Sequence, residues 1–158
     1  MIDNTRGGVW GPYTALMQIP DLAGRVASVG EHLRFNGVLP GAERELAILC
    51  SAKENNSRFE WAVHAPVARE EGLRADLLEY LRSGKETKFS QREKMIVEIV
   101  RSLNRKKTIA ESLYREAEAL FTAEELVEIV TICGFYQMLA YVISAFDVPE
   151  PDSDIASF

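Results

Sequence analysis

The pattern of apolar and polar positions predicts helices along most of the chain. Apolar residues recur at intervals of three and four, which is the spacing of one face of an α-helix. These amphipathic stretches cover residues 21–35, 42–55, 57–71, 74–81, 90–106, 108–120 and 122–146. No segment shows the sustained alternation of a half-buried strand. The sequence therefore predicts an all-α fold of six or seven helices.

Four of the predicted helices begin with the same short motif. Ser57, Ser90, Thr108 and Thr122 are each followed three residues later by a glutamate. In such a capping box, the hydroxyl and the carboxylate each bind a backbone N–H group that the first helical turn leaves without a partner. We therefore expect capping boxes at these four helix starts.

The last predicted helix is apolar around most of its circumference. Between Val127 and Phe146, Glu128 is the only charged residue. An apolar surface this wide exceeds the stripe by which a helix ordinarily packs on a domain. The helix is expected either to lie at the centre of the domain or to be covered by another subunit, and we predict a homo-oligomer.

Length and composition predict a single folded domain. The chain has 158 residues, of which 47% are hydrophobic and 27% are charged. These values are typical of one soluble globular domain. We expect that domain to span residues 1–158, with an N-terminal extension at 1–12 and a frayed acidic tail at 149–158.

Charge and hydropathy narrow the expected partners and compartment. The net charge of −6 disfavours binding to the phosphate backbone of nucleic acids. No run of about 18 apolar residues without charge suggests a membrane span, and the N-terminus lacks the cationic and apolar regions of a signal peptide. The expectation is a cytoplasmic protein that acts on a small molecule, with no nucleic-acid or membrane partner.

The two cysteines are expected to be buried, reduced thiols. Cys50 and Cys133 lie far apart in the sequence among apolar neighbours, and they form no CxxC motif and no zinc-binding spacing. A redox pair is the alternative interpretation. The sequence also lacks a GxSxG nucleophile motif, a P-loop, a GxGxxG motif and an HExxH motif.

Glu60 and His64 are the pair with the clearest chemical potential. Their spacing of four residues places both side chains on one helix face, where a carboxylate can orient an imidazole for acid–base chemistry near neutral pH. Pro66 is expected to kink or interrupt the same helix, because it removes a backbone hydrogen bond. The alternative is an ordinary surface pair in which Glu60 only completes a capping box. His32 is expected to be a surface or partly packed residue.

The stretch RELAILCSAKENNSRFEWAVHAPVAREEG, from Arg44 to Gly72, resembles the carboxymuconolactone decarboxylase family of the alkylhydroperoxidase D-like superfamily. The C-terminal stretch FTAEELVEIVTICGFYQMLAYVISAFDVPEP resembles the closing helix of the same family. The resemblance extends over about residues 11–149. It implies an all-helical bundle built around a helical hairpin and assembled into trimers or hexamers.

The resemblance also assigns candidate site residues. In the peroxidase branch, a glutamate on the first helix of the hairpin is followed by C-x-H-C-x-x-x-H on the second, and Glu45 and His64 match the glutamate and the last histidine. Ser57 and Glu60 stand where the two cysteines would be, and Phe59 stands at the first histidine. Without the dithiol, no thiolate is available to attack a peroxide. Glu60 and His64 instead resemble the Glu-x-x-x-His of the decarboxylase branch.

The expected function is that of a carboxymuconolactone decarboxylase-like lyase acting on a small carboxylated lactone or related cyclic acid. His64 would be the general acid–base, Glu60 its orienting partner, and Glu45 a second carboxylate from the neighbouring helix. No metal or organic cofactor is expected, because the lactone carbonyl can accept the electrons. The alternatives are a hydrolase, isomerase or peroxidase-related enzyme at the same site, or a non-catalytic oligomeric binding module. An arginine such as Arg44 or Arg58 could hold a substrate carboxylate.

Overall fold

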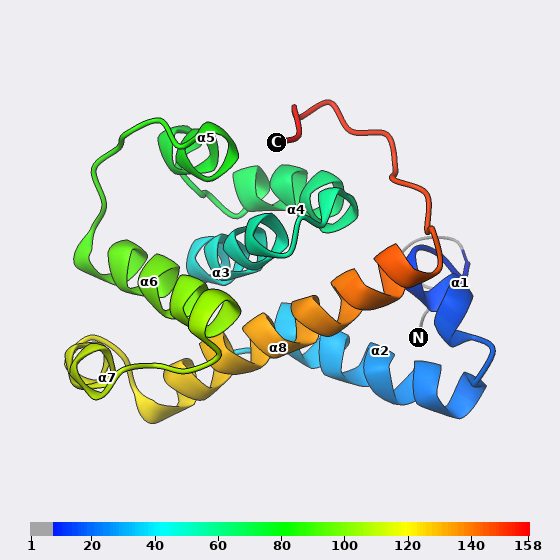
Figure 1. Cartoon of the computed structure of the whole chain (residues 1–158), viewed down its shortest axis with the longest axis horizontal. Coiled ribbons are helices and arrows are strands. Elements are labelled where there is room, and N and C mark those ends of the chain that lie inside the picture. The colour runs from blue at the N-terminus through cyan, green and yellow to red at the C-terminus, as the bar shows by residue number, and fades with distance from the viewer. Residues whose placement is uncertain (1–7) are drawn as a thin grey trace.

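The computed structural model describes residues 8–158, and these form eight helices and no strand (Figure 1). The all-α prediction is confirmed. The helices are α1 (Pro12–Leu16), α2 (Pro20–Phe35), α3 (Gly41–Glu54), α4 (Arg58–Glu70), α5 (Ala75–Ser83), α6 (Gln91–Lys106), α7 (Glu111–Glu118) and α8 (Ala123–Ala145). The short helix α1 is additional to those predicted. It starts with Pro12, whose fixed φ suits the first position of a helix.

Helix α3 lies at the centre of the molecule. It packs against α4, with which it forms a helical hairpin, and against α6 and α8 (Figure 1). Every residue from Glu45 to Ala52 is buried, because these three neighbours enclose the helix on all sides. The core around it is filled by large side chains that are fully buried, among them Trp61, Ile96, Ile99, Ile129 and Ile132.

Helix α8 crosses the molecule and packs against α3, α6, α1, α2 and α4 (Figure 1). By length and composition it could cross a membrane, which differs from the sequence expectation, although 56% of its most apolar window is buried in the fold. Glu128, the glutamate of α8 that is buried, accepts a hydrogen bond of 2.5 Å from the backbone N–H of Val38, in the loop between α2 and α3. A Cβ atom at Gly37 would lie 2.2 Å from the same carboxylate. The buried carboxylate of Glu128 therefore holds the loop between α2 and α3 in place.

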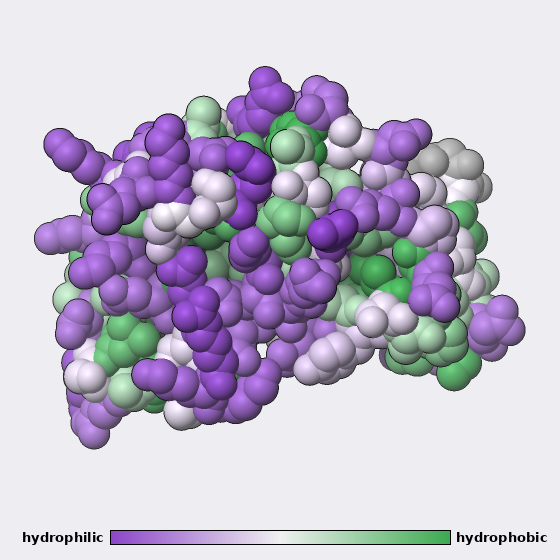
Figure 2. Space-filling view, turned by 45° about the horizontal axis from the view of Figure 1, so that its top comes forward, coloured by the Kyte–Doolittle hydropathy of each residue, from purple (hydrophilic) through white to green (hydrophobic). Residues whose placement is uncertain are grey.

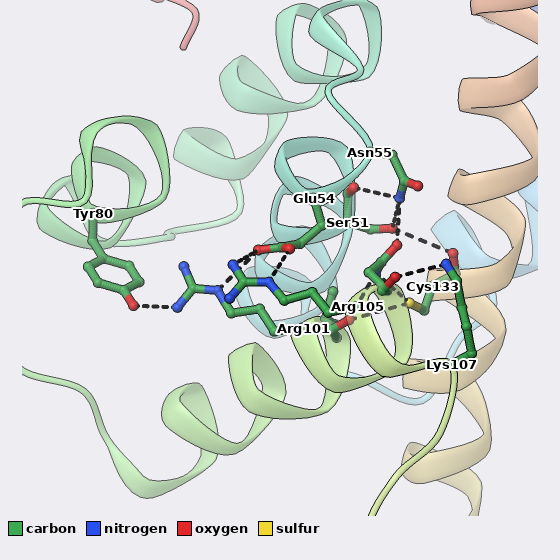
Figure 3. Close-up of polar contacts among 10 residues, drawn as sticks. Ser51, Glu54, Asn55, Tyr80, Arg101, Arg105, Lys107 and Cys133 are labelled. Atoms are coloured by element: carbon green, nitrogen blue, oxygen red, sulfur yellow. Dashed lines mark hydrogen bonds and ion pairs between the residues drawn. The ribbon is translucent and has the colours of Figure 1, made fainter.

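A polar network ties the C-terminal end of α3 to α6 (Figure 3). Glu54 accepts hydrogen bonds from Arg105 at 2.6 Å and from Arg101 at 3.3 Å. Asn55 donates to the Asn104 side chain at 2.8 Å, and Asn104 donates to the Cys133 sulfur at 3.0 Å. The network satisfies polar groups that lie beside the core and fixes the end of the central helix.

Two of the four predicted capping boxes form. Those at Ser90 and Thr122 have both of their hydrogen bonds. The prediction for Thr108 is wrong, because α7 starts at Glu111 and its N-cap is Ala110. Ser57 is the N-cap of α4, but within residues 8–158 its hydroxyl has no hydrogen-bond partner. The helix α4 itself runs through Pro66 without interruption.

The C-terminal tail packs on α4, whereas the sequence predicted that residues 149–158 would be frayed. The indole N–H of Trp61 donates to the backbone oxygen of Ala156 at 3.1 Å, and the ring of Phe158 lies edge-on to Trp61 at 5.3 Å. The ammonium of Lys53 lies 4.2 Å from the centre of the Phe158 ring. Of the predicted N-terminal extension, residues 1–7 lie outside the described residues, and Trp10 packs on Phe59 at 5.0 Å.

Candidate functional site

Three helices bring four ionisable side chains together in the interior. Glu45 comes from α3, Glu60 and His64 from α4, and Tyr136 from α8. Their exposed fractions are 0%, 4%, 3% and 3%, so all four are shielded from bulk water. Buried ionisable groups are costly unless they are paired, which makes such a cluster a candidate for function.

Glu45 is the hydrogen-bond partner of His64. Its carboxylate oxygen lies 2.8 Å from Nδ1 of the imidazole, across the α3–α4 hairpin. Burial alone would raise the pKa of the Glu45 carboxyl, but the hydrogen bonds and charges of His64 and Arg44 outweigh it and hold the pKa below its ordinary value of 4.5. The ionised carboxylate therefore accepts a hydrogen bond from Nδ1–H of the imidazole. This leaves Nε2 as the nitrogen that can exchange a proton with a substrate.

Glu60 lies beside the other ring nitrogen, although not within hydrogen-bond distance. Its carboxylate oxygen is 3.6 Å from Nε2 of His64. The i,i+4 spacing thus brings the two side chains together, as the sequence predicted. The geometry gives the orienting contact to Glu45 and places Glu60 where it can attract a protonated Nε2.

Tyr136 is a member of the cluster that the sequence analysis missed, because it was counted with the apolar residues of the last helix. Its hydroxyl lies 3.2 Å from Nε2 of His64. Burial, followed by the charges of Glu60 and Glu45, raises the pKa of Tyr136 well above its ordinary value of 10.0. The phenol is therefore neutral and can donate to Nε2. The available signal was the tyrosine itself, since a buried tyrosine hydroxyl generally needs a polar partner.

Three members of the cluster, Glu60, His64 and Tyr136, form part of the wall of a large pocket, and Glu45 lies behind them. The pocket has a volume of about 830 Å³, which is within the range of small-molecule sites. Its wall is built from α1, α2, α4 and α8 and is mainly apolar and aromatic. Apolar and aromatic side chains are accompanied by a few polar ones; the lining includes Trp10, Phe59, Phe135, Leu139, Glu60, His64, Tyr136 and Arg34.

The other residues that the sequence singled out lie away from this pocket. Cys50 and Cys133 are buried and do not line it, and burial raises the pKa of the Cys50 thiol to about 12. His32 is exposed. Arg44 forms ion pairs with Glu45 and with Glu71. Within residues 8–158, no group of three or more His, Cys, Asp or Glu residues is arranged to hold a metal ion.

Arg58, the second arginine considered as a possible anchor for a substrate carboxylate, is exposed and does not line the pocket.

Comparison with known proteins gives the fold. No family model and no curated protein sequence matches the chain. An uncharacterised peroxidase-related protein from Silicibacter sp. TM1040 superposes with a TM-score of 0.76 at 15% identity, over 89% of this chain and 75% of that one. A protein of unknown function from Agrobacterium tumefaciens superposes with a TM-score of 0.76 at 16% identity, over 87% of this chain and 95% of that one. An AhpD-type role in antioxidant defence has been suggested for that protein. The chain therefore has an alkylhydroperoxidase D-like fold.

Within the alkylhydroperoxidase D-like fold, the α3–α4 hairpin carries the three residues that the sequence resemblance singled out. Glu45 comes from its first helix, and Glu60 and His64 come from its second. The fold thus brings the candidate residues to one place, beside a pocket and against the hydroxyl of Tyr136.

Proposed function

We propose that the pocket is the active site of a lyase that removes carbon dioxide from a small carboxylated lactone or related cyclic acid. The observation that carries this proposal is the position of His64. Its Nδ1 is held by the ionised Glu45 at 2.8 Å, while its Nε2 lies in the wall of the pocket beside Tyr136 and Glu60. A fixed imidazole whose second nitrogen lies in the wall of a mainly apolar pocket is suited to deliver a proton to carbon.

Decarboxylation needs an electron acceptor and a proton donor. When the bond between the ring carbon and the carboxylate breaks, its electron pair moves into the conjugated lactone carbonyl and carbon dioxide leaves. The resulting dienolate takes the proton from Nε2 of protonated His64, which restores the carbonyl. One proton from solvent then returns His64 to its charged form, so one proton is consumed for each turnover.

The neighbouring groups have distinct roles in this scheme. Glu45 holds the orientation of the ring from the side opposite Nε2, through its contact with Nδ1. When His64 is neutral, the Tyr136 hydroxyl donates a hydrogen bond to Nε2 and so keeps this nitrogen directed toward the pocket. Glu60 attracts the protonated Nε2 from the pocket side.

A peroxidase-related activity is the second candidate, because the two fold neighbours carry descriptions of that kind. Thiol-based peroxide reduction needs a thiolate that the peroxide can reach. Neither cysteine lines the pocket, and burial raises the pKa of both thiols. These features favour acid–base chemistry at His64 over thiol chemistry.

The test is turnover of a panel of carboxylated lactones and β-keto acids by the wild type and by His64→Ala. We expect a loss of roughly 10²- to 10⁴-fold, which is the usual contribution of a positioned acid–base group. His32→Ala is the matched control, since His32 is exposed and lies outside the pocket, and it should retain full activity. Equal turnover by the wild type and His64→Ala would contradict the proposal. Turnover of esters or double-bond isomers alone would favour a hydrolase or an isomerase at the same site.

A further inference from the structure

A substrate that keeps a second carboxylate after losing carbon dioxide needs a cation in the pocket that can bind the kept group. Among residues 8–158, two arginines line the pocket, Arg25 and Arg34, and both come from α2. Arginine is the residue best shaped for a carboxylate, because its planar guanidinium can donate two parallel hydrogen bonds. The environment of each arginine decides which of them is available.

Arg25 is already engaged and is far from enclosed. It forms an ion pair with Asp21 at 3.3 Å, and the side chains of the two residues are 77% and 84% exposed. A carboxylate bound there would compete with Asp21 and would remain in water, where an ion pair contributes little.

Arg34 is in the opposite situation. It lies in the last turn of α2 and is half-buried, and its guanidinium rests 4.9 Å from the centre of the Phe35 ring. Within the described part of the chain it forms no ion pair with a carboxylate. Its positive charge also acts on Tyr136, where it opposes the rise in the pKa of that residue. Among the described residues, Arg34 is therefore the pocket arginine without a carboxylate partner, and its charge reaches Tyr136.

Gly30 helps to bring Arg34 to this position. It lies one turn before Arg34 and also lines the pocket. A Cβ atom at Gly30 would come within 3.1 Å of the Phe135 ring and 3.4 Å of the Tyr13 hydroxyl. The absence of a side chain lets α2 approach α8 closely, so that Arg34 and Tyr136 share one pocket.

We propose that Arg34 binds a carboxylate that remains on the substrate through the reaction and so places the reacting carbon at His64. This inference rests on the proposed function, but it concerns binding rather than chemistry. An arginine paired with the departing carboxylate would stabilise the ground state more than the transition state, in which that charge moves into the ring. The anchored group must therefore be a carboxylate that stays on the molecule. Binding of the product should then depend on Arg34 in the same way as binding of the substrate.

The test measures binding of 2-furoate, an unreactive ring carboxylate, and of its neutral amide 2-furamide, by isothermal titration calorimetry. Arg34→Gln is compared with the wild type and with Arg25→Gln, the matched change at the other pocket arginine. We expect 2-furoate to bind Arg34→Gln roughly 10- to 100-fold more weakly than the wild type, as for the loss of a hydrogen bond to a charged group. The affinity of Arg25→Gln should change by less than about twofold, and 2-furamide should bind all three proteins alike.

Two results would overturn the assignment of Arg34. One is equal affinity of 2-furoate for the wild type and Arg34→Gln, and the other is no binding of 2-furoate to the wild type at millimolar concentration. Repeating the titration in the His64→Ala background separates this inference from the proposed function. If binding depends on Arg34 but His64→Ala keeps full turnover, the proposed function is contradicted and the role of Arg34 is not. If the affinity for 2-furoate does not depend on Arg34 while His64→Ala loses turnover, the role of Arg34 is contradicted and the proposed function is not.

Discussion

Glu45 is a fully buried carboxylate whose charge is retained through two partners, His64 and Arg44. Removing one partner of a buried ion pair leaves the other uncompensated, at a cost of about 3–5 kcal/mol. Glu45→Gln keeps the shape of the side chain and removes its charge. The substitution should therefore lower the free energy of unfolding by about this amount at neutral pH, measured by chemical denaturation.

The same residue should give the protein an acid-dependent stability. The folded structure holds the pKa of Glu45 below 4.5, so in this range the unfolded state binds more protons at this group than the folded state. Its contribution is present above about pH 4.5 and is lost as the pH falls through the lower folded-state pKa. The difference in unfolding free energy between the wild type and Glu45→Gln should therefore shrink in acid. A difference in unfolding free energy that stays constant below pH 4.5 would contradict this prediction. The surface control is Glu124→Gln, at an exposed position of α8.

The sequence predicted part of this residue-scale arrangement. The i,i+4 spacing was enough to place Glu60 beside His64. It did not show that Glu45 would be the closer partner, because the contact crosses a hairpin and depends on how α3 and α4 pack. Tyr136 is 72 residues from His64 in sequence, and only the tertiary position of α8 brings its hydroxyl to the imidazole.

At the scale of elements, the helix N-caps give a direct energetic comparison. Ser90 caps α6 with both bonds of a capping box, whereas the Ser57 hydroxyl at the start of α4 has no hydrogen-bond partner among the described residues. Ser90→Ala should lower the free energy of unfolding by about 0.5–2 kcal/mol. Ser57→Ala should cost less, because it removes a buried hydroxyl that is not bonded. Urea denaturation of both variants checks this, and an equal loss would mean that the Ser57 hydroxyl is bonded in solution.

Helices were more predictable than the segments that join and follow them. The long helices were found because their apolar periodicity extends over many residues, and their ends differ from the predicted ones by only a few positions. Helix α1 has five residues, which is too short for a periodic signal. The tail was expected to fray because its sequence is acidic and contains prolines, but the contacts of Ala156 and Phe158 with Trp61 come from packing.

At the scale of the whole molecule, apolar side chains remain exposed on α8. Val127, Val130 and Tyr141 lie on one face of this helix and are 67%, 42% and 61% exposed. On the face shown in Figure 2, hydrophilic side chains predominate, and apolar groups are exposed in separate places, including several on the right. The homo-oligomer therefore stays a prediction, now with a defined surface on α8 for a second copy of the chain.

Tyr141→Asp tests this prediction without disturbing the core. A carboxylate on the α8 face would be buried without a partner in an oligomer but would remain in water in a monomer. The wild type should be an oligomer by light scattering at micromolar concentration, and Tyr141→Asp should dissociate into folded monomers. Tyr114→Asp, at an exposed tyrosine of α7 that is 44% exposed, should leave the assembly intact. A monomeric wild type would rule out the prediction.

The bond between Glu128 and the backbone of Val38 has an evolutionary consequence. It leaves no room for a side chain at Gly37 and requires a backbone N–H at position 38. The loop that it holds joins α2, which carries Arg34, to α3, which carries Glu45, so a change there would be transmitted both to the α2 wall of the pocket and to the carboxylate that holds His64. Related chains that keep a glutamate at the position of Glu128 should therefore keep glycine at 37 and exclude proline at 38. Lineages that lose the glutamate should be released from both restrictions together.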